Sequence, residues 1–333
     1  MTSGIIFMTR EVITFLKKVN LFIVLIRSLI MSGNSRVIFS VYKEVNDESV
    51  TDYKKQQLKK YKDNLVKRQQ QYADFCNADY FVYENNNQLV EIDEYNTIQF
   101  FKINQLEKMA EEYDEILYLD LDVIPFNFVN FFESHDLSKL CCFQQDCYEW
   151  GLKRYVQESV KRRDIPYFEV RPIPLQERLK NSGYYFHKEN IDNLDSQNWW
   201  VKACAKNAML LLDNHTDFNN MIVNTGVIGG NSSIIKKMCF IDSLGSMLSS
   251  LSNAADDNIY PTEISSLIRP NNEVFLTYLI EKTNIETNYL DESWNYIVDD
   301  FRQDTDNDDT VFLHVINKEF DKYDYKYNLF KSD

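Results

Sequence analysis

The sequence predicts an α/β protein with a mostly parallel sheet flanked by helices and an inserted lobe. Short apolar runs alternate with longer amphipathic segments through residues 36–145, the order expected of βαβ units. One of these runs ends in a pair of aspartates, at the edge where such sheets bind ligands. The chain has 333 residues, 44% of them hydrophobic, which is enough for a sizeable core and argues against general disorder.

The first predicted strand is Val37–Tyr42 (VIFSVY), because its residues are apolar, aromatic or β-branched. Residues 49–77 predict a long amphipathic helix, since apolar side chains recur there at helical spacing. The same reasoning places the next elements, in order, at Tyr80–Tyr83 (strand), Thr97–Glu112 (helix), Glu115–Val123 (strand, EILYLDLDV), Phe128–His135 (short helix) and Leu140–Phe143 (strand).

Residues 146–218 interrupt this pattern. They are rich in Tyr, Trp and charged residues, and three prolines break any long element, so they predict an inserted lobe on the acceptor side. Residues 219–333 return to the α/β pattern, with a strand at Ile222–Gly230, helices at Ser232–Leu251 and Glu273–Lys282, and a strand at Val311–Ile316.

Charge and cysteine content limit the partners and the compartment. With 36 basic and 51 acidic residues the net charge is −15, so nucleic acid is not expected as a partner. The six cysteines form no CxxC pair and indicate reduced thiols in a cytoplasmic protein. Residues 1–35 read as an N-terminal extension. Within it, the apolar run at 12–31 is interrupted by charges and predicts an amphipathic or anchor-like segment with peripheral membrane contact rather than a span.

Asp120 and Asp122 are the strongest chemical signal. On a strand, alternate residues point to the same side, so both carboxylates would face one point at the strand end. Hard oxygen ligands of this kind suit Mg²⁺ or Mn²⁺. A solvated turn is the structural alternative for such a pair.

The segment YDEILYLDLDVIPFN, residues 113–127, resembles the metal-binding segment of GT-A glycosyltransferases. The resemblance is closest to glycosyltransferase family 8, which includes glycogenin and bacterial lipopolysaccharide galactosyltransferases. Four further pieces follow the order of that family: QFFKINQLEKM around Lys102, VNTGVIGGNS around Asn224, PNNEV at residues 270–274, and FLHVINK from 312 to 318. The family's Asp-Gln pair is Asn-Asn here, at positions 271 and 272, which leaves the donor open.

The resemblance implies a GT-A, Rossmann-like fold and a metal-dependent transferase. It would transfer a sugar from a nucleoside-diphosphate sugar, in the UDP form, to a glycan or glycoprotein, with retention of configuration. Residues 36–145 would bind the nucleotide sugar, and residues 219–333 would form the sugar and acceptor side. The implied residues are Asp120, Asp122 and His314 for Mn²⁺ or Mg²⁺; Lys102, Asp120, Asn224, Gly226 and Lys318 for the donor; and Glu273, Asn272 and Asn224 for catalysis.

Each implied residue also has a structural interpretation. His314 could be a hydrogen-bonded core histidine, Lys102 a surface lysine, and Glu273 a cap for the helix that it opens. Two other functions remain open from the sequence: a nucleotidyltransferase, which shares the α/β layout and metal-phosphate chemistry, and a non-catalytic sugar-nucleotide-binding or membrane-associated protein on the same scaffold.

Overall fold

The computed structural model describes residues 35–42, 51–84, 94–147, 219–256, 271–298 and 309–330, with parts of 202–215. The chain divides into two units, Met1–Ser35 and Arg36–Asp333, and the described elements belong to the second. The segment 12–31 and nearly all of the lobe predicted at 146–218 lie outside the described residues. Among the described residues, no helix has both the length and the apolar character needed to cross a membrane.

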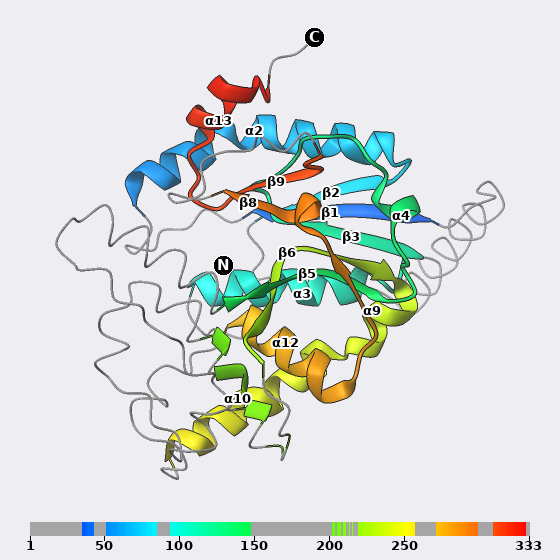
Figure 1. The fold of residues 1–333 in the computed structure, drawn as a ribbon, viewed down its shortest axis with the longest axis vertical. Helices are drawn as coiled ribbons and strands as arrows, with labels where there is room; N and C mark the ends of the chain where they lie inside the picture. Colours follow the sequence, from blue (N-terminus) through cyan, green and yellow to red (C-terminus); the bar gives the residue numbers. More distant parts are fainter. Residues whose placement is uncertain are drawn as a thin grey trace, which may run out of the picture. The chain divides into compact units, whose positions relative to one another are not determined.

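The second unit contains a six-stranded sheet in the order β2-β1-β3-β6-β5-β7 (Figure 1). Its strands are β1 (Arg36–Tyr42), β2 (Asp79–Glu84), β3 (Glu115–Leu119), β5 (Leu140–Asp146), β6 (Met221–Asn231) and β7 (Thr287–Leu290). Strand β1 pairs in parallel with β2 and β3, and β5 with β7, whereas β6 runs antiparallel to both of its neighbours. The predicted fold class, α/β with a mostly parallel sheet flanked by helices, is therefore confirmed.

Helices cover both faces of this sheet, which explains why the inner strands β1 and β3 are mostly apolar runs rather than alternating ones. In β1, Val37 and Phe39 belong to the core cluster on the side of α3 (Glu94–Met109), together with residues of α12 (Asn272–Thr283) and α10 (Phe240–Asp256). Ile38 points the other way and packs in the cluster that includes residues of α2 (Asp52–Phe75). Figure 1 shows α2 and α3 on opposite sides of the sheet.

A second, three-stranded sheet has the order β4-β9-β8. Its strands are β4 (Val123–Pro125), β8 (Tyr296–Val298) and β9 (Phe312–Val315). Apolar residues of these strands pack with α2 and with α13 (Phe320–Tyr327) in one cluster. The small sheet therefore places β9 beside the end of β3, where the candidate site forms.

The prediction of one continuous strand over residues 115–123 is wrong. Strand β3 ends at Leu119, and the chain turns at Asp120–Asp122 before β4 joins the second sheet. The Val123 N–H donates to the Asp120 carbonyl at 2.9 Å and closes the turn, while Gln69 Nε2 donates to the carbonyls of Asp120 (3.0 Å) and Val123 (2.8 Å). The two aspartates thus lie on a braced turn, not on alternate positions of a strand.

The predicted helix at Ser232–Leu251 is two helices, α9 (Ser232–Met238) and α10. Cys239 between them has a left-handed backbone, with φ of 46°. Glu107 of α3 accepts hydrogen bonds from the N–H groups of Phe240 (2.6 Å) and Ile241 (3.3 Å), and so satisfies donors at the start of α10. Elements that the sequence did not predict are β4, β7, β8, α13, and the 3-10 helix η1 (Glu292–Asn295).

Candidate functional site

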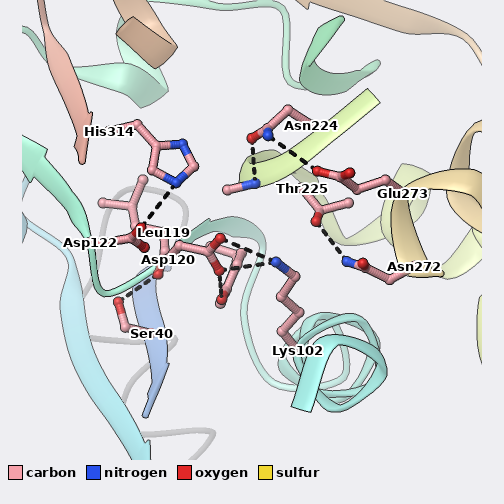
Figure 2. Close-up of polar contacts among 12 residues, drawn as sticks. Ser40, Lys102, Leu119, Asp120, Asp122, Asn224, Thr225, Asn272, Glu273 and His314 are labelled. Carbon is pink, nitrogen blue, oxygen red and sulfur yellow. Dashed lines mark hydrogen bonds and ion pairs between the residues drawn. The ribbon is translucent and has the colours of Figure 1, made fainter. Parts of the chain in front are cut away.

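Asp120, Asp122 and His314 converge at the junction of the two sheets (Figure 2). The aspartates come from the turn after β3, and His314 comes from β9, where it lies opposite Val123 of β4. The Val315 N–H donates to the Asp122 carbonyl at 3.0 Å and holds the turn against β9. One ligand atom from each of the three residues lies within 4.8 Å of the others. The structure thus brings together the three residues proposed from the sequence as metal ligands.

Two lysines already contact the carboxylates. Lys102 of α3 is only 2% exposed, and its Nζ lies 3.0 Å and 3.3 Å from the two carboxylate oxygens of Asp120. The Tyr118 hydroxyl donates to the same carboxylate. Lys318, which follows β9 in a left-handed conformation with φ of 60°, donates to Asp122. Lys102 is therefore a buried residue of the site and not a surface lysine.

The buried carboxyl of Asp122 is held in its ionised form. Burial on its own would raise the pKa of Asp122, but the adjacent Lys318 and His314 outweigh burial and hold that pKa well below its usual range. By contrast, burial, followed by the nearby Asp120 charge, raises the pKa of Tyr118 well above its ordinary value. At neutral pH Asp122 is therefore a carboxylate, and the Tyr118 phenol stays neutral and donates to Asp120.

These residues fit a hard divalent cation. Mn²⁺ and Mg²⁺ take carboxylate oxygens and accept an imidazole nitrogen, and His314 Nε2 faces Asp122 Oδ2 at 3.4 Å. Ligand atoms around one Mg²⁺ lie at most roughly 4.2 Å apart, so the trio needs only a small contraction from its present spread of 4.8 Å. Metal binding would also require the lysines to share or release the carboxylates.

Gly226 makes room for the histidine. A Cβ built on Gly226 would lie 2.9 Å from His314 Nδ1 and closer still to Cε1. A glycine inside a strand often marks the close approach of another group, and here that group is the His314 ring. The Gly226 carbonyl also accepts the Asp120 N–H at 2.8 Å, so this position of β6 contacts both sides of the metal-ligand cluster.

A hydrogen-bonded chain leads from His314 toward α12. His314 Nδ1 lies 2.9 Å from Asn295 Oδ1, and Asn295 Nδ2 donates to Asn224 Oδ1 at 3.0 Å. Asn224 Nδ2 then donates to Glu273 Oε1 at 3.2 Å, and Lys202 pairs with the other oxygen of Glu273. Asn224 and Glu273 are thus connected to His314 through Asn295.

The polar residues in the first turn of α12 make different hydrogen bonds. Asn271 is the N-cap, and its side chain accepts from the N–H groups of Glu273 (3.0 Å) and Val274 (3.2 Å). Asn272 Nδ2 donates to Thr225 Oγ1 at 2.6 Å. Because Asn271 caps the helix, Glu273 is not needed as the cap, and its side chain faces Asn224 instead (Figure 2).

Sequence reasoning missed three residues that contact the site, namely Tyr118, Lys202 and Asn295. Tyr118 lies two residues before Asp120 in an apolar run and looked like a core residue. Asn295 lies 71 residues from Asn224 along the chain, and Lys202 lies 71 residues from Glu273. No local pattern marks either of them, so only the fold reveals these contacts.

No protein-family model matches the sequence, and no curated protein sequence matches it. Solved structures with a similar arrangement include a glycosyltransferase involved in the glycosylation of the major capsid of PBCV-1, with 12% identity, a TM-score of 0.39, and coverage of 87% of this chain and 98% of that one. Mouse xyloside xylosyltransferase 1 has 11% identity, a TM-score of 0.39, and coverage of 85% and 98%.

A third similar structure is that of the WbbM bifunctional glycosyltransferase. It has 10% identity and a TM-score of 0.38, and the match covers 86% of this chain but 46% of the WbbM chain.

Proposed function

We propose that this chain is a divalent-metal-dependent glycosyltransferase. It takes a sugar from a nucleoside-diphosphate sugar, in the UDP form, and transfers it to a glycan or glycoprotein acceptor. The observation that carries the proposal is the convergence of Asp120, Asp122 and His314, two of them already paired with lysines that can turn to phosphate oxygens. A bound Mn²⁺ or Mg²⁺ would supply Lewis-acid stabilisation of the diphosphate oxygens.

The charges of the site support a diphosphate ligand. Asp120 and Asp122 are balanced by Lys102 and Lys318, so a divalent cation leaves an excess of about two positive charges. A nucleoside-diphosphate sugar carries about two negative charges, and its leaving group carries about three after the glycosidic bond breaks. Lys318 is 27% exposed in its side chain and is therefore the lysine best able to move from Asp122 to the leaving diphosphate.

The polar cluster on β6 and α12 suits the donor sugar. Asn224 and Glu273 offer an amide and a carboxylate, the groups that hydrogen-bond sugar hydroxyls, and both are buried. We assign them to orienting the donor, with Asn272 positioning Thr225 beside them. Transfer with retention of configuration remains part of the proposal, on the family resemblance, and residues 146–218 are proposed to serve the acceptor.

The test is NMR-monitored turnover of a panel of UDP- and GDP-sugars by the full chain, with Mn²⁺ and with EDTA. Metal-dependent release of UDP or GDP from one donor is the expected result. Asp136→Asn is the matched control for replacing an aspartate of the site, and its turnover is expected to equal that of the wild type. Asp136 is exposed, and its side chain bonds with Ser138 and Lys139 outside the site. Release of pyrophosphate from a nucleoside triphosphate would instead indicate a nucleotidyltransferase. No turnover and no donor-induced shifts would overturn the proposal in favour of a non-catalytic scaffold.

A further inference from the structure

We infer that Asn295 is a positioning residue for the metal site. It fixes which nitrogen of His314 carries the proton, and so keeps Nε2 available as a ligand. Asn295 ends the 3-10 helix η1 and is fully buried. The inference rests on the proposed function only in taking Asp120, Asp122 and His314 as the metal ligands.

The backbone N–H of Gly226 is a donor whose direction cannot change. The backbone N–H of Gly226 lies 3.0 Å from one atom of the Asn224 side-chain amide. Because a backbone N–H can only donate, that atom must be the oxygen, Oδ1. The other end of the same amide lies 3.2 Å from Glu273 Oε1, which accepts as a carboxylate oxygen. Two independent partners therefore orient the Asn224 amide the same way.

The orientation of Asn224 fixes that of Asn295. Asn224 Oδ1 can only accept, so the atom of Asn295 that lies 3.0 Å from it must be the amino nitrogen, Nδ2. The amide oxygen of Asn295 is then the atom that lies 2.9 Å from His314 Nδ1. No alternative flip of Asn295 satisfies both contacts.

The orientation of Asn295 fixes the tautomer of His314. An amide oxygen can only accept, so Nδ1 of His314 must carry the hydrogen in this contact. Nε2 faces Asp122 Oδ2 at 3.4 Å. When Nε2 gives up any proton that it shares with this carboxylate, its lone pair is free for a metal while Nδ1 keeps its hydrogen. A metal ligand needs this lone pair, and partners on the distal ring nitrogen orient metal-binding histidines in general.

The position of the His314 ring is fixed, as well as the hydrogen on its Nδ1. Gly226 leaves no free space beside the His314 ring, since even a Cβ there would lie 2.9 Å from Nδ1. The ring is therefore held between β6 and the Asn295 amide, with its Nε2 edge directed at the carboxylate.

The test compares Asn295→Leu with the wild type, using Mn²⁺ alone as the probe. Leucine has the same number of side-chain heavy atoms as asparagine, with the same branch at Cγ, but cannot accept from Nδ1–H. Free Mn²⁺ is counted by electron paramagnetic resonance, and the affinity is expected to fall by about 10- to 100-fold. The matched control is Asn207→Leu, because Asn207 is also a buried asparagine but donates to Asn219 outside the site. Its Mn²⁺ affinity is expected to stay at the wild-type value.

Two further measurements remain decisive if Asn295→Leu does not fold. Asn295→Asp keeps an acceptor for Nδ1–H, and its Mn²⁺ affinity is expected to stay close to that of the wild type. In the wild-type protein, ¹⁵N NMR of labelled histidine, assigned by the loss of a signal in His314→Gln, should show the hydrogen on Nδ1. A hydrogen on Nε2 of neutral His314, or an unchanged Mn²⁺ affinity in a folded Asn295→Leu variant, would overturn the inference.

None of these measurements needs a sugar nucleotide. Loss of Mn²⁺ binding in Asn295→Leu, without turnover of any donor by the wild type, would refute the proposed function and support the role of Asn295. Turnover by the wild type, with unchanged Mn²⁺ binding in Asn295→Leu, would support the proposed function and refute the role of Asn295.

Discussion

Replacing Gly226 by alanine tests how tightly the fold holds His314, the histidine proposed as a metal ligand. The added Cβ would lie 2.9 Å from His314 Nδ1 and closer to Cε1, whereas ordinary contacts begin at 3.4 Å. The ring must therefore withdraw by at least the difference of 0.5 Å between these distances. Functional groups have to be held within about 0.5 Å of their working geometry, and a displacement of about 1 Å costs roughly 100-fold in rate.

We therefore expect Gly226→Ala to weaken Mn²⁺ binding and to lower donor turnover by roughly 10- to 100-fold. Overpacking should also reduce the free energy of unfolding by about 1–3 kcal/mol. Isothermal titration with Mn²⁺, the turnover assay and urea unfolding measure the three effects. Gly245→Ala is the control, because its Cβ would meet nothing within 4 Å on α10, and alanine favours a helix by about 1 kcal/mol. A Gly226→Ala variant that binds Mn²⁺ as tightly as the wild type would show that the contact with Gly226 does not position the His314 ring for metal binding.

Three further predictions concern charged residues. Asp122→Asn should lower turnover by more than about 100-fold with the fold retained, since losing a ligand exceeds the cost of losing an outer-shell partner; circular dichroism and the donor assay check this. Lys102→Met frees Asp120 from its ion pair. Without nucleotide, Mn²⁺ should therefore bind roughly tenfold more tightly, while the rate of sugar transfer falls. A loss of both Mn²⁺ affinity and transfer would contradict this prediction. Asp321 bonds with Lys60, Tyr61 and Gln57, which lower its pKa from 3.8 to about 2. The contribution of Asp321 to the free energy of unfolding is therefore complete above its unfolded pKa and is lost as the pH falls toward 2. In Asp321→Asn, the free energy of unfolding should fall by about 0.2–1 kcal/mol less over this acid range than in the wild type.

The sequence predicts the inner strands of the main sheet well because strands such as β1 and β3 are largely buried on both faces. Runs such as Val37–Tyr42 and the apolar part of the segment from Glu115 are strands because they leave no polar face. The end of β3 could not be predicted in the same way. Its turn depends on Gly226, 106 residues away along the chain, which accepts the Asp120 N–H, and on a small sheet whose other strands come from the C-terminal part.

In the candidate site, too, local sequence motifs predict some residues, whereas contacts between residues far apart in the chain could not be predicted. Asp120, Asp122 and His314 were identified from motifs, and the structure places them together. The reason given for the Asp pair, alternation on a strand, was wrong, because a turn aligns them. The lysine contacts of Asp120 and Asp122 and the role of Asn295 arise from side chains that meet only after folding. No local spacing encodes those contacts.

An anomalous difference map from crystals of the full chain grown with Mn²⁺ and UDP tests whether Asp120, Asp122 and His314 hold a divalent metal against a nucleoside diphosphate. We expect a manganese peak within bonding distance of Asp120, Asp122 and His314 Nε2, with UDP phosphate oxygens completing the coordination and Lys318 turned toward them. Manganese bound elsewhere, or UDP bound with its phosphates away from this trio, would contradict this expectation.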